Sequence, residues 1–130
     1  KMNGDNSIKS VLPAIFSTSN YIKETYSKPL IFGTHLRGHI LYNIDANSKL
    51  KDPYKTLPDK YSKLNVKKDE LLLDDGKVQN GGAALVAFGK LQFKEIKKEE
   101  RDAIITSLLQ YCELDTLAML MIYEHWNSVR

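Results

Sequence analysis

The last third of the chain constrains the fold most, because residues 99–126 place hydrophobic side chains at helical spacing. Glu99 and Glu100 stand where acidic side chains favour the start of a helix. Steps of three or four residues then follow one stripe, made of Ile104, Leu108, Cys112, Asp115, Met119, Ile122 and Trp126. We therefore expect a long helix that turns this stripe, including the Cys112 thiol, toward the core.

Asp115 is the polar exception on this stripe. A buried carboxylate costs several kcal/mol unless it is paired, hydrogen-bonded or bound to a metal ion. One interpretation is a break around residues 114–116, where Asp115 or Thr116 caps a second helix. The other interpretation is functional, because Tyr111 stands four residues earlier and so on the same face of the helix. The spacing alone leaves both interpretations open.

The rest of the chain predicts shorter elements. Hydrophobic spacing in residues 8–15 indicates a short helix, in which Pro13 lies near the first turn or makes a kink. A second short helix is expected within residues 17–27. A third is expected over residues 83–93, with Ala84, Phe88 and Leu91 on one side.

The middle of the chain has the weakest pattern. Residues 30–32 and 39–42 are typical of short strands, and Gly33 and Gly38 lie between them. Residues 43–70 contain two prolines among turn-forming residues and indicate an irregular excursion or insertion. The predicted fold class is therefore mainly α, or α+β with at most a small hairpin. We expect residues 1–130 to form a single domain or the C-terminal fragment of a larger one.

Composition narrows the function classes. The chain has 130 residues and one cysteine, which excludes an internal disulfide framework and a cysteine zinc site. No run approaches the roughly 20 consecutive apolar residues that span a bilayer, so we expect a cytoplasmic protein with no membrane association.

Residues 1–68 hold 12 Lys and Arg against 5 Asp and Glu, whereas residues 69–130 hold 7 against 11. The basic half fits either a polyanion partner or a solvated lysine-rich surface.

Four strings of the sequence together resemble one bacterial family, domain of unknown function 2779. The most specific is LLQYCELDTLAM at residues 108–119. SIKSVLPA at residues 7–14, DPYKTLP at 52–58 and GGAA at 81–84 support it and occur in the family's order. The resemblance touches most of the chain but covers residues 29–51 poorly.

The resemblance implies a ribonuclease-H-like fold and a metal-dependent 3′–5′ exonuclease acting on nucleic acid. By match to the family's Tyr-x-x-x-Asp motif, Asp115 corresponds to the last acidic metal ligand and Tyr111 to the tyrosine that orients the attacking water. The complete enzyme uses Mg²⁺ or Mn²⁺. Four lysines are candidate contacts to the nucleic-acid backbone: Lys60, Lys63, Lys67 and Lys68.

The sequence departs from a complete enzyme of this kind. It has neither an Asp-x-Glu on a hydrophobic strand nor a second acidic motif. We therefore expect the missing motifs in an N-terminal part of the same protein, no tight metal binding by this chain alone, and no activity without that part. The face that meets the missing part should be either unusually apolar or made of polar groups that are buried.

Two further possibilities stay open. The alternative function is a non-catalytic helical module that binds another protein, in which Asp115 is a cap or a satisfied polar core residue. His35 and His39 are four residues apart and are weak candidates for zinc, because no third ligand is near and the glycines disfavour a helix there.

Overall fold

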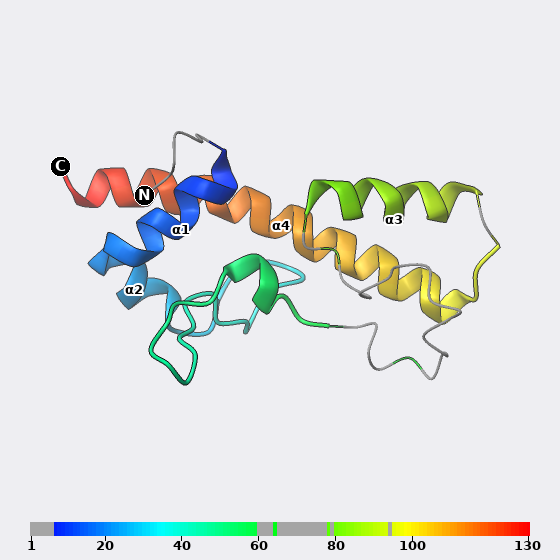
Figure 1. Ribbon diagram of the computed structural model, residues 1–130, viewed down its shortest axis with the longest axis horizontal. Helices are drawn as coiled ribbons and strands as arrows, with labels where there is room; N and C mark the ends of the chain where they lie inside the picture. Colours follow the sequence, from blue (N-terminus) through cyan, green and yellow to red (C-terminus); the bar gives the residue numbers. More distant parts are fainter. Residues whose placement is uncertain (1–6, 60–63, 65–77, 79, 94) are drawn as a thin grey trace. The chain divides into compact units, whose positions relative to one another are not determined.

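The computed structural model describes residues 7–59, 64, 78, 80–93 and 95–130. They form four α-helices and one short 3-10 helix, in the order α1 (Ile8–Thr18), α2 (Asn20–Tyr26), η1 (Pro53–Thr56), α3 (Gly81–Phe93) and α4 (Lys98–Ser128) (Figure 1). No strand occurs within these residues, apart from an isolated antiparallel bridge between Ile44 and Leu50. The mainly α class is therefore confirmed.

Two compact units divide the chain. The first unit comprises Lys1–Thr56 and Glu113–Arg130, and the second comprises Leu57–Cys112. Helix α4 contributes its first half to the second unit and its second half to the first unit. The candidate site residues on α4 therefore fall on both sides of the boundary.

The first unit is built on α1 and α2. Pro13 lies inside α1, not at its first turn, so the helix lacks the hydrogen bond that an N–H at residue 13 would make. Burial of Leu12, Ile15 and Phe16 offsets this loss. Helix α2 begins after Ser19, whose side-chain hydroxyl accepts a hydrogen bond of 3.3 Å from the backbone N–H of Ile22. Both helices were expected from the sequence.

The second unit contains α3 and the first half of α4. Asn80 caps α3, because its side-chain oxygen accepts a hydrogen bond of 2.8 Å from the backbone N–H of Ala83. Ala87 and Leu91 are buried, whereas Phe88 is exposed, contrary to the side predicted for it. At the other end of the helix, Arg101 of α4 donates a hydrogen bond to the carbonyl oxygen of Leu91. This bond ties α3 to α4.

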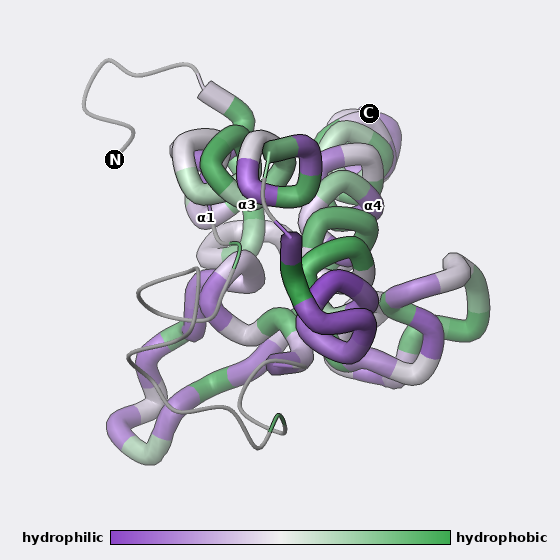
Figure 2. Tube along the Cα trace, turned by 90° about the vertical axis from the view of Figure 1, so that its right-hand side faces the viewer, coloured by the Kyte–Doolittle hydropathy of each residue, from purple (hydrophilic) through white to green (hydrophobic). Residues whose placement is uncertain are grey.

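Helix α4 is unbroken over its 31 residues, so the predicted break around residues 114–116 is wrong. After a hydrophilic first turn, its middle turns are largely hydrophobic (Figure 2). The buried seam alternates steps of three and four residues, and consists of Ile104, Ser107, Tyr111, Leu114, Ala118 and Met121. The stripe predicted from the sequence begins on this seam at Ile104 but then leaves it.

A second stripe lies on the opposite face of α4 and is exposed. It alternates steps of four and three residues and consists of Ile105, Leu109, Cys112, Thr116, Met119, Tyr123 and Trp126. Cys112 is therefore exposed and not buried as predicted. The predicted stripe failed because α4 is apolar on two faces, and spacing alone does not say which of them is buried.

The expected small hairpin does not form. Residues 30–39 make a closed loop, in which the Leu30 N–H donates to the carbonyl of His39 and the Gly38 N–H donates to the carbonyl of Leu30. Gly33 and Gly38 have φ values of 89° and 80°, so the chain turns sharply instead of running extended. Within the predicted excursion at residues 43–70, the described part holds η1 and the Ile44–Leu50 bridge.

Helix α4 also has the length and apolar composition of a membrane-spanning helix. The core helix of a folded domain has the same properties, and 44% of the most apolar window of α4 is buried inside the protein. This observation is weak support for a membrane span, and the expectation of no membrane association stays a prediction.

Candidate functional site

Tyr111 and Asp115, the two residues of the predicted catalytic motif, both lie on α4 and are separated by one helical turn. Tyr111 is buried, and its hydroxyl lies 4.0 Å from the position that a Cβ would take at Gly81, near the start of α3. Asp115 is half-buried. Tyr111 belongs to the second unit and Asp115 to the first.

The Asp115 carboxylate is hydrogen-bonded to a residue far away in the sequence. The phenolic hydroxyl of Tyr54 donates a bond of 2.6 Å to Oδ1 of Asp115. Tyr54 belongs to η1 and is only 3% exposed, so its ring is fixed by the surrounding core. Asp115 is therefore a hydrogen-bonded residue within a helix and does not cap one.

The local sequence explains how Tyr54 reaches α4. The Asp52 side chain accepts a hydrogen bond of 3.0 Å from the Tyr54 backbone N–H, and Pro53 fixes the backbone at the start of η1. The ammonium group of Lys9, on α1, lies 5.2 Å from the centre of the Tyr54 ring. Tyr54 thus connects α1, η1 and α4 within the first unit.

Glu113 forms a second anchor, which the sequence analysis did not identify. Its carboxylate accepts three hydrogen bonds, from the backbone N–H groups of Thr34, His35 and Leu36, at 2.8–3.3 Å. Successive N–H groups that converge on one carboxylate form an anion-binding nest. The two glycines of the loop were the available signal, because a positive φ at Gly33 lets the backbone approach this carboxylate closely.

A third anchor joins α2 to the end of α4. The Tyr26 hydroxyl donates a hydrogen bond of 2.5 Å to Oε2 of Glu124. Burial, this hydrogen bond and the negative charge of Glu124 together raise the pKa of Tyr26 well above its ordinary value of 10. Three carboxylates on the second half of α4 therefore accept hydrogen bonds from other segments of the first unit.

His35 and His39, the weak zinc candidates, belong to no metal-binding group among the described residues. Among the described residues, no group of three His, Cys, Asp or Glu side chains is placed to hold a metal ion. His39 is half-buried, burial lowers its pKa, and its Nε2 has no hydrogen-bond partner within the described part of the chain. The four candidate backbone-contacting lysines, Lys60, Lys63, Lys67 and Lys68, lie outside the described residues.

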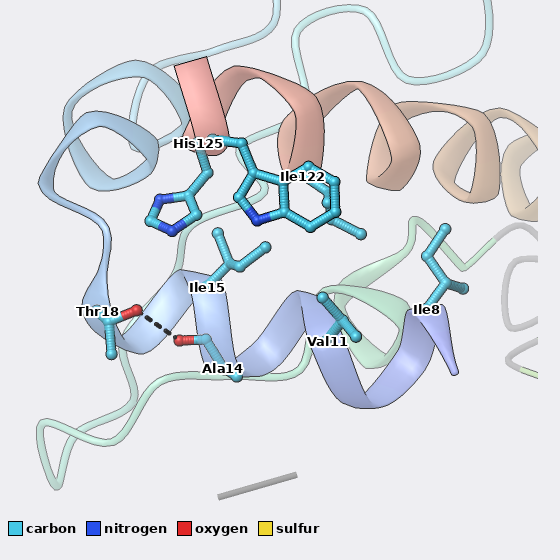
Figure 3. Close-up of a pocket in the computed structure, with 8 residues that line it drawn as sticks. Ile8, Val11, Ala14, Ile15, Thr18, Ile122 and His125 are labelled. Carbon is cyan, nitrogen blue, oxygen red and sulfur yellow. Dashed lines mark hydrogen bonds between the residues drawn. The ribbon is translucent and has the colours of Figure 1, made fainter. Parts of the chain in front are cut away.

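An apolar groove of about 600 Å³ lies between α1 and the last turns of α4 (Figure 3). Its lining includes Ile8, Val11, Ile15, Ile122, His125 and Trp126. Nδ1 of His125 is buried and has no partner among the residues described. The groove offers apolar contact and one imidazole, and so differs in kind from the polar anchors.

Comparison with known proteins adds no assignment: the chain matches no family model, no curated protein and no solved structure.

Proposed function

We propose that this chain is the C-terminal part of a metal-dependent 3′–5′ exonuclease that acts on nucleic acid and that it supplies the last catalytic motif, Tyr111 and Asp115. The observation that carries the proposal is the unbroken course of α4 through this motif, with the two side chains one helical turn apart. A broken helix with Asp115 as a cap would have removed the shared face that the motif needs.

The exposed stripe of α4 supports the same proposal. Its hydrophobic members, among them Met119, Tyr123 and Trp126, lie on the side of the helix opposite the buried seam. An apolar stripe of this length is costly in water and is typical of a surface that another part of the protein covers. An N-terminal part that carries the missing acidic motifs is the cover that the proposal requires.

The described residues do not form a two-metal centre by themselves. Mg²⁺ needs several oxygen ligands, and Asp115 stands without two further metal-ligating side chains within the part of the chain that is described. We therefore propose that this chain alone is inactive and assign no catalytic step to it. Mg²⁺ or Mn²⁺ would bind where Asp115 meets acidic residues of the N-terminal part.

One observation favours a second candidate, the non-catalytic protein-binding module. The Tyr54 hydroxyl satisfies Oδ1 of Asp115, which is what a structural role for this carboxylate requires. The two candidates differ in what the loss of the Asp115 charge affects: hydrolysis in the first, and only stability in the second.

Hydrolysis by the complete protein tests the proposal. A 5′-labelled single strand with Mg²⁺ or Mn²⁺ should be shortened stepwise from its 3′ end, and Asp115→Asn should abolish the ladder. Asn keeps an oxygen that accepts the Tyr54 hydrogen bond, so this variant should fold. Asp102→Asn, which changes an exposed carboxylate of α4, is the matched control and should stay active. Full activity of Asp115→Asn, or a folded complete protein that cleaves nothing, would move the assignment to the binding module.

A further inference from the structure

The loop at residues 30–39 is rigidly held although it presents apolar and cationic side chains to solvent. Its base is closed by the two backbone hydrogen bonds between Leu30 and the 38–39 segment, and Leu30 and Leu36 are buried. Glu113 fixes its centre through three backbone N–H groups. These contacts favour the observed shape of the loop in the free protein.

The exposed side chains of this loop are unusual for a solvated surface. Ile31 is 86% exposed and Phe32 is 39% exposed, on a loop that the buried leucines already anchor. Neither side chain is needed to hold the loop closed. Rigid loops that expose an aromatic side chain are typical of binding sites, because little conformational entropy is lost on binding.

Arg37 supplies a cation on the same loop. Nε of Arg37 donates a hydrogen bond of 3.2 Å to the carbonyl of Gly33, the residue that follows Phe32. This bond holds the guanidinium group against the loop backbone, at the residue after Phe32. A fixed guanidinium suits the oxygens of a phosphate.

The charge of the surrounding sequence favours a polyanion. Residues 25–44 contain Lys28, Arg37 and two histidines but no Asp or Glu. The one carboxylate that reaches the loop, Glu113, is surrounded by backbone N–H groups. A phosphate at Arg37 would therefore meet this cation without an opposing acidic residue from the loop itself.

We propose that the 30–39 loop binds single-stranded nucleic acid, with Phe32 stacked on an unpaired base and Arg37 on an adjacent phosphate. Aromatic stacking needs the open face of a base, which a single strand offers and a duplex hides. This inference rests on the proposed function for its class of ligand, and it names the loop as a substrate contact distinct from the Tyr111–Asp115 motif.

Binding measured without turnover tests the loop. The probe is a fluorescein-labelled single strand, with the same sequence as a duplex for comparison, bound to the complete protein in EDTA and followed by fluorescence anisotropy. Phe32→Ala should weaken single-strand binding by roughly tenfold or more and leave duplex binding unchanged. Arg37→Ala should weaken binding. It should also make the association constant less dependent on salt, with a reduction of about 0.7 in the magnitude of the slope of log association constant against log salt concentration.

Matched controls isolate the loop. Tyr21 on α2 is also 39% exposed, and Lys23 is an exposed cation on the same helix, so Tyr21→Ala and Lys23→Ala should bind like the wild type. Glu113→Ala, which frees the loop, should also weaken binding. Equal affinities for Phe32→Ala and Tyr21→Ala, or a wild-type protein that binds no single strand, would overturn the inference.

The two proposals fail separately. If Phe32 and Arg37 are needed for binding but no strand is cleaved, the loop assignment stands and the exonuclease is lost. If cleavage depends on Asp115 while both loop variants bind normally, the exonuclease stands and the loop assignment is lost.

Discussion

Tyr54 and Asp115 are 61 residues apart in the sequence, and the hydroxyl of the first donates a hydrogen bond of 2.6 Å to Oδ1 of the second. The bond joins η1 to the middle of α4, at the residue to which the nuclease proposal assigns a metal ligand. It gives Asp115 a fixed side-chain orientation whichever function is correct. Its contribution to stability can be measured separately from activity.

Tyr54→Phe removes the hydroxyl and keeps the buried ring. We expect the free energy of unfolding to fall by about 1–3 kcal/mol, because the half-buried Asp115 carboxylate loses its donor. Urea unfolding measures the change, and Tyr21→Phe at an exposed tyrosine should stay within about 0.5 kcal/mol of the wild type. In a double-mutant cycle with Asp115→Ala, additive effects would contradict a direct interaction.

Gly33→Ala and Gly38→Ala separate backbone strain from a steric clash. Both glycines have a positive φ, so each substitution should cost about 1–2 kcal/mol. A Cβ at Gly33 would also collide with Oε1 of Glu113, whereas one at Gly38 meets no atom within 4 Å. Glu113 can move away only by losing its bonds to the loop, so Gly33→Ala should cost at least about 1 kcal/mol more. Equal losses in thermal or urea unfolding would show that the Glu113 anchor is weak.

His39 should make stability fall in mildly acidic solution. Burial lowers its pKa in the folded state below the ordinary 6.5, so the unfolded chain takes up the proton first as the pH falls. The contribution of His39 is therefore fully present above pH 6.5 and is lost below it. Urea unfolding at about pH 7.5 and pH 5.5 measures how much the free energy of unfolding falls between the two pH values. This fall should be smaller for His39→Leu than for the wild type. The control variant His35→Leu, on the same loop, should show the same fall in the free energy of unfolding as the wild type. An identical fall in all three proteins would contradict the prediction.

Tyr26 should make stability fall in alkaline solution. Burial, the hydrogen bond to Glu124 and its charge raise the pKa of Tyr26 in the folded state, so the unfolded chain loses the proton first. The contribution is fully present below pH 10 and is lost as the pH rises above 10. Tyr26→Phe should lower the free energy of unfolding by about 1–3 kcal/mol at neutral pH. The free energy of unfolding of this variant should also fall less than that of the wild type as the pH rises above 10.

Glu124→Gln is the companion variant for Tyr26. It keeps an oxygen that accepts the hydrogen bond but removes the charge. Its free energy of unfolding at neutral pH should therefore lie between those of the wild type and Tyr26→Phe. A Tyr26→Phe protein as stable as the wild type would show that the bond contributes nothing.

Local sequence patterns predicted the existence of the helices well. Hydrophobic spacing and acidic residues at Glu99 and Glu100 predicted α4, and the apolar residues around Pro13 predicted α1 despite the proline. The helix over residues 83–93 was also expected, and the structure adds that Asn80 caps it. These features depend on interactions between residues three or four positions apart, which the sequence contains directly.

The buried face of α4 was not predictable in the same way. Ile104 and Ile105 are neighbours, yet the first is buried and the second is exposed, and each begins an apolar stripe along the helix. A helical period identifies an apolar face but does not choose between two of them. The exposed stripe also explains why Cys112 was wrongly expected in the core.

Local patterns in the sequence predicted the mainly helical class, and they placed Tyr111 and Asp115 one turn apart on any helix that continues through both residues. The partners of the three acidic residues in the second half of α4 depend on tertiary contacts: Tyr54 for Asp115, the 30–39 loop for Glu113 and Tyr26 for Glu124. The physical reason is distance along the chain. The sequence around a carboxylate does not show whether its hydrogen-bond donor will be a phenol or a backbone N–H. In the folded protein these donors lie between 61 and 98 residues away along the chain.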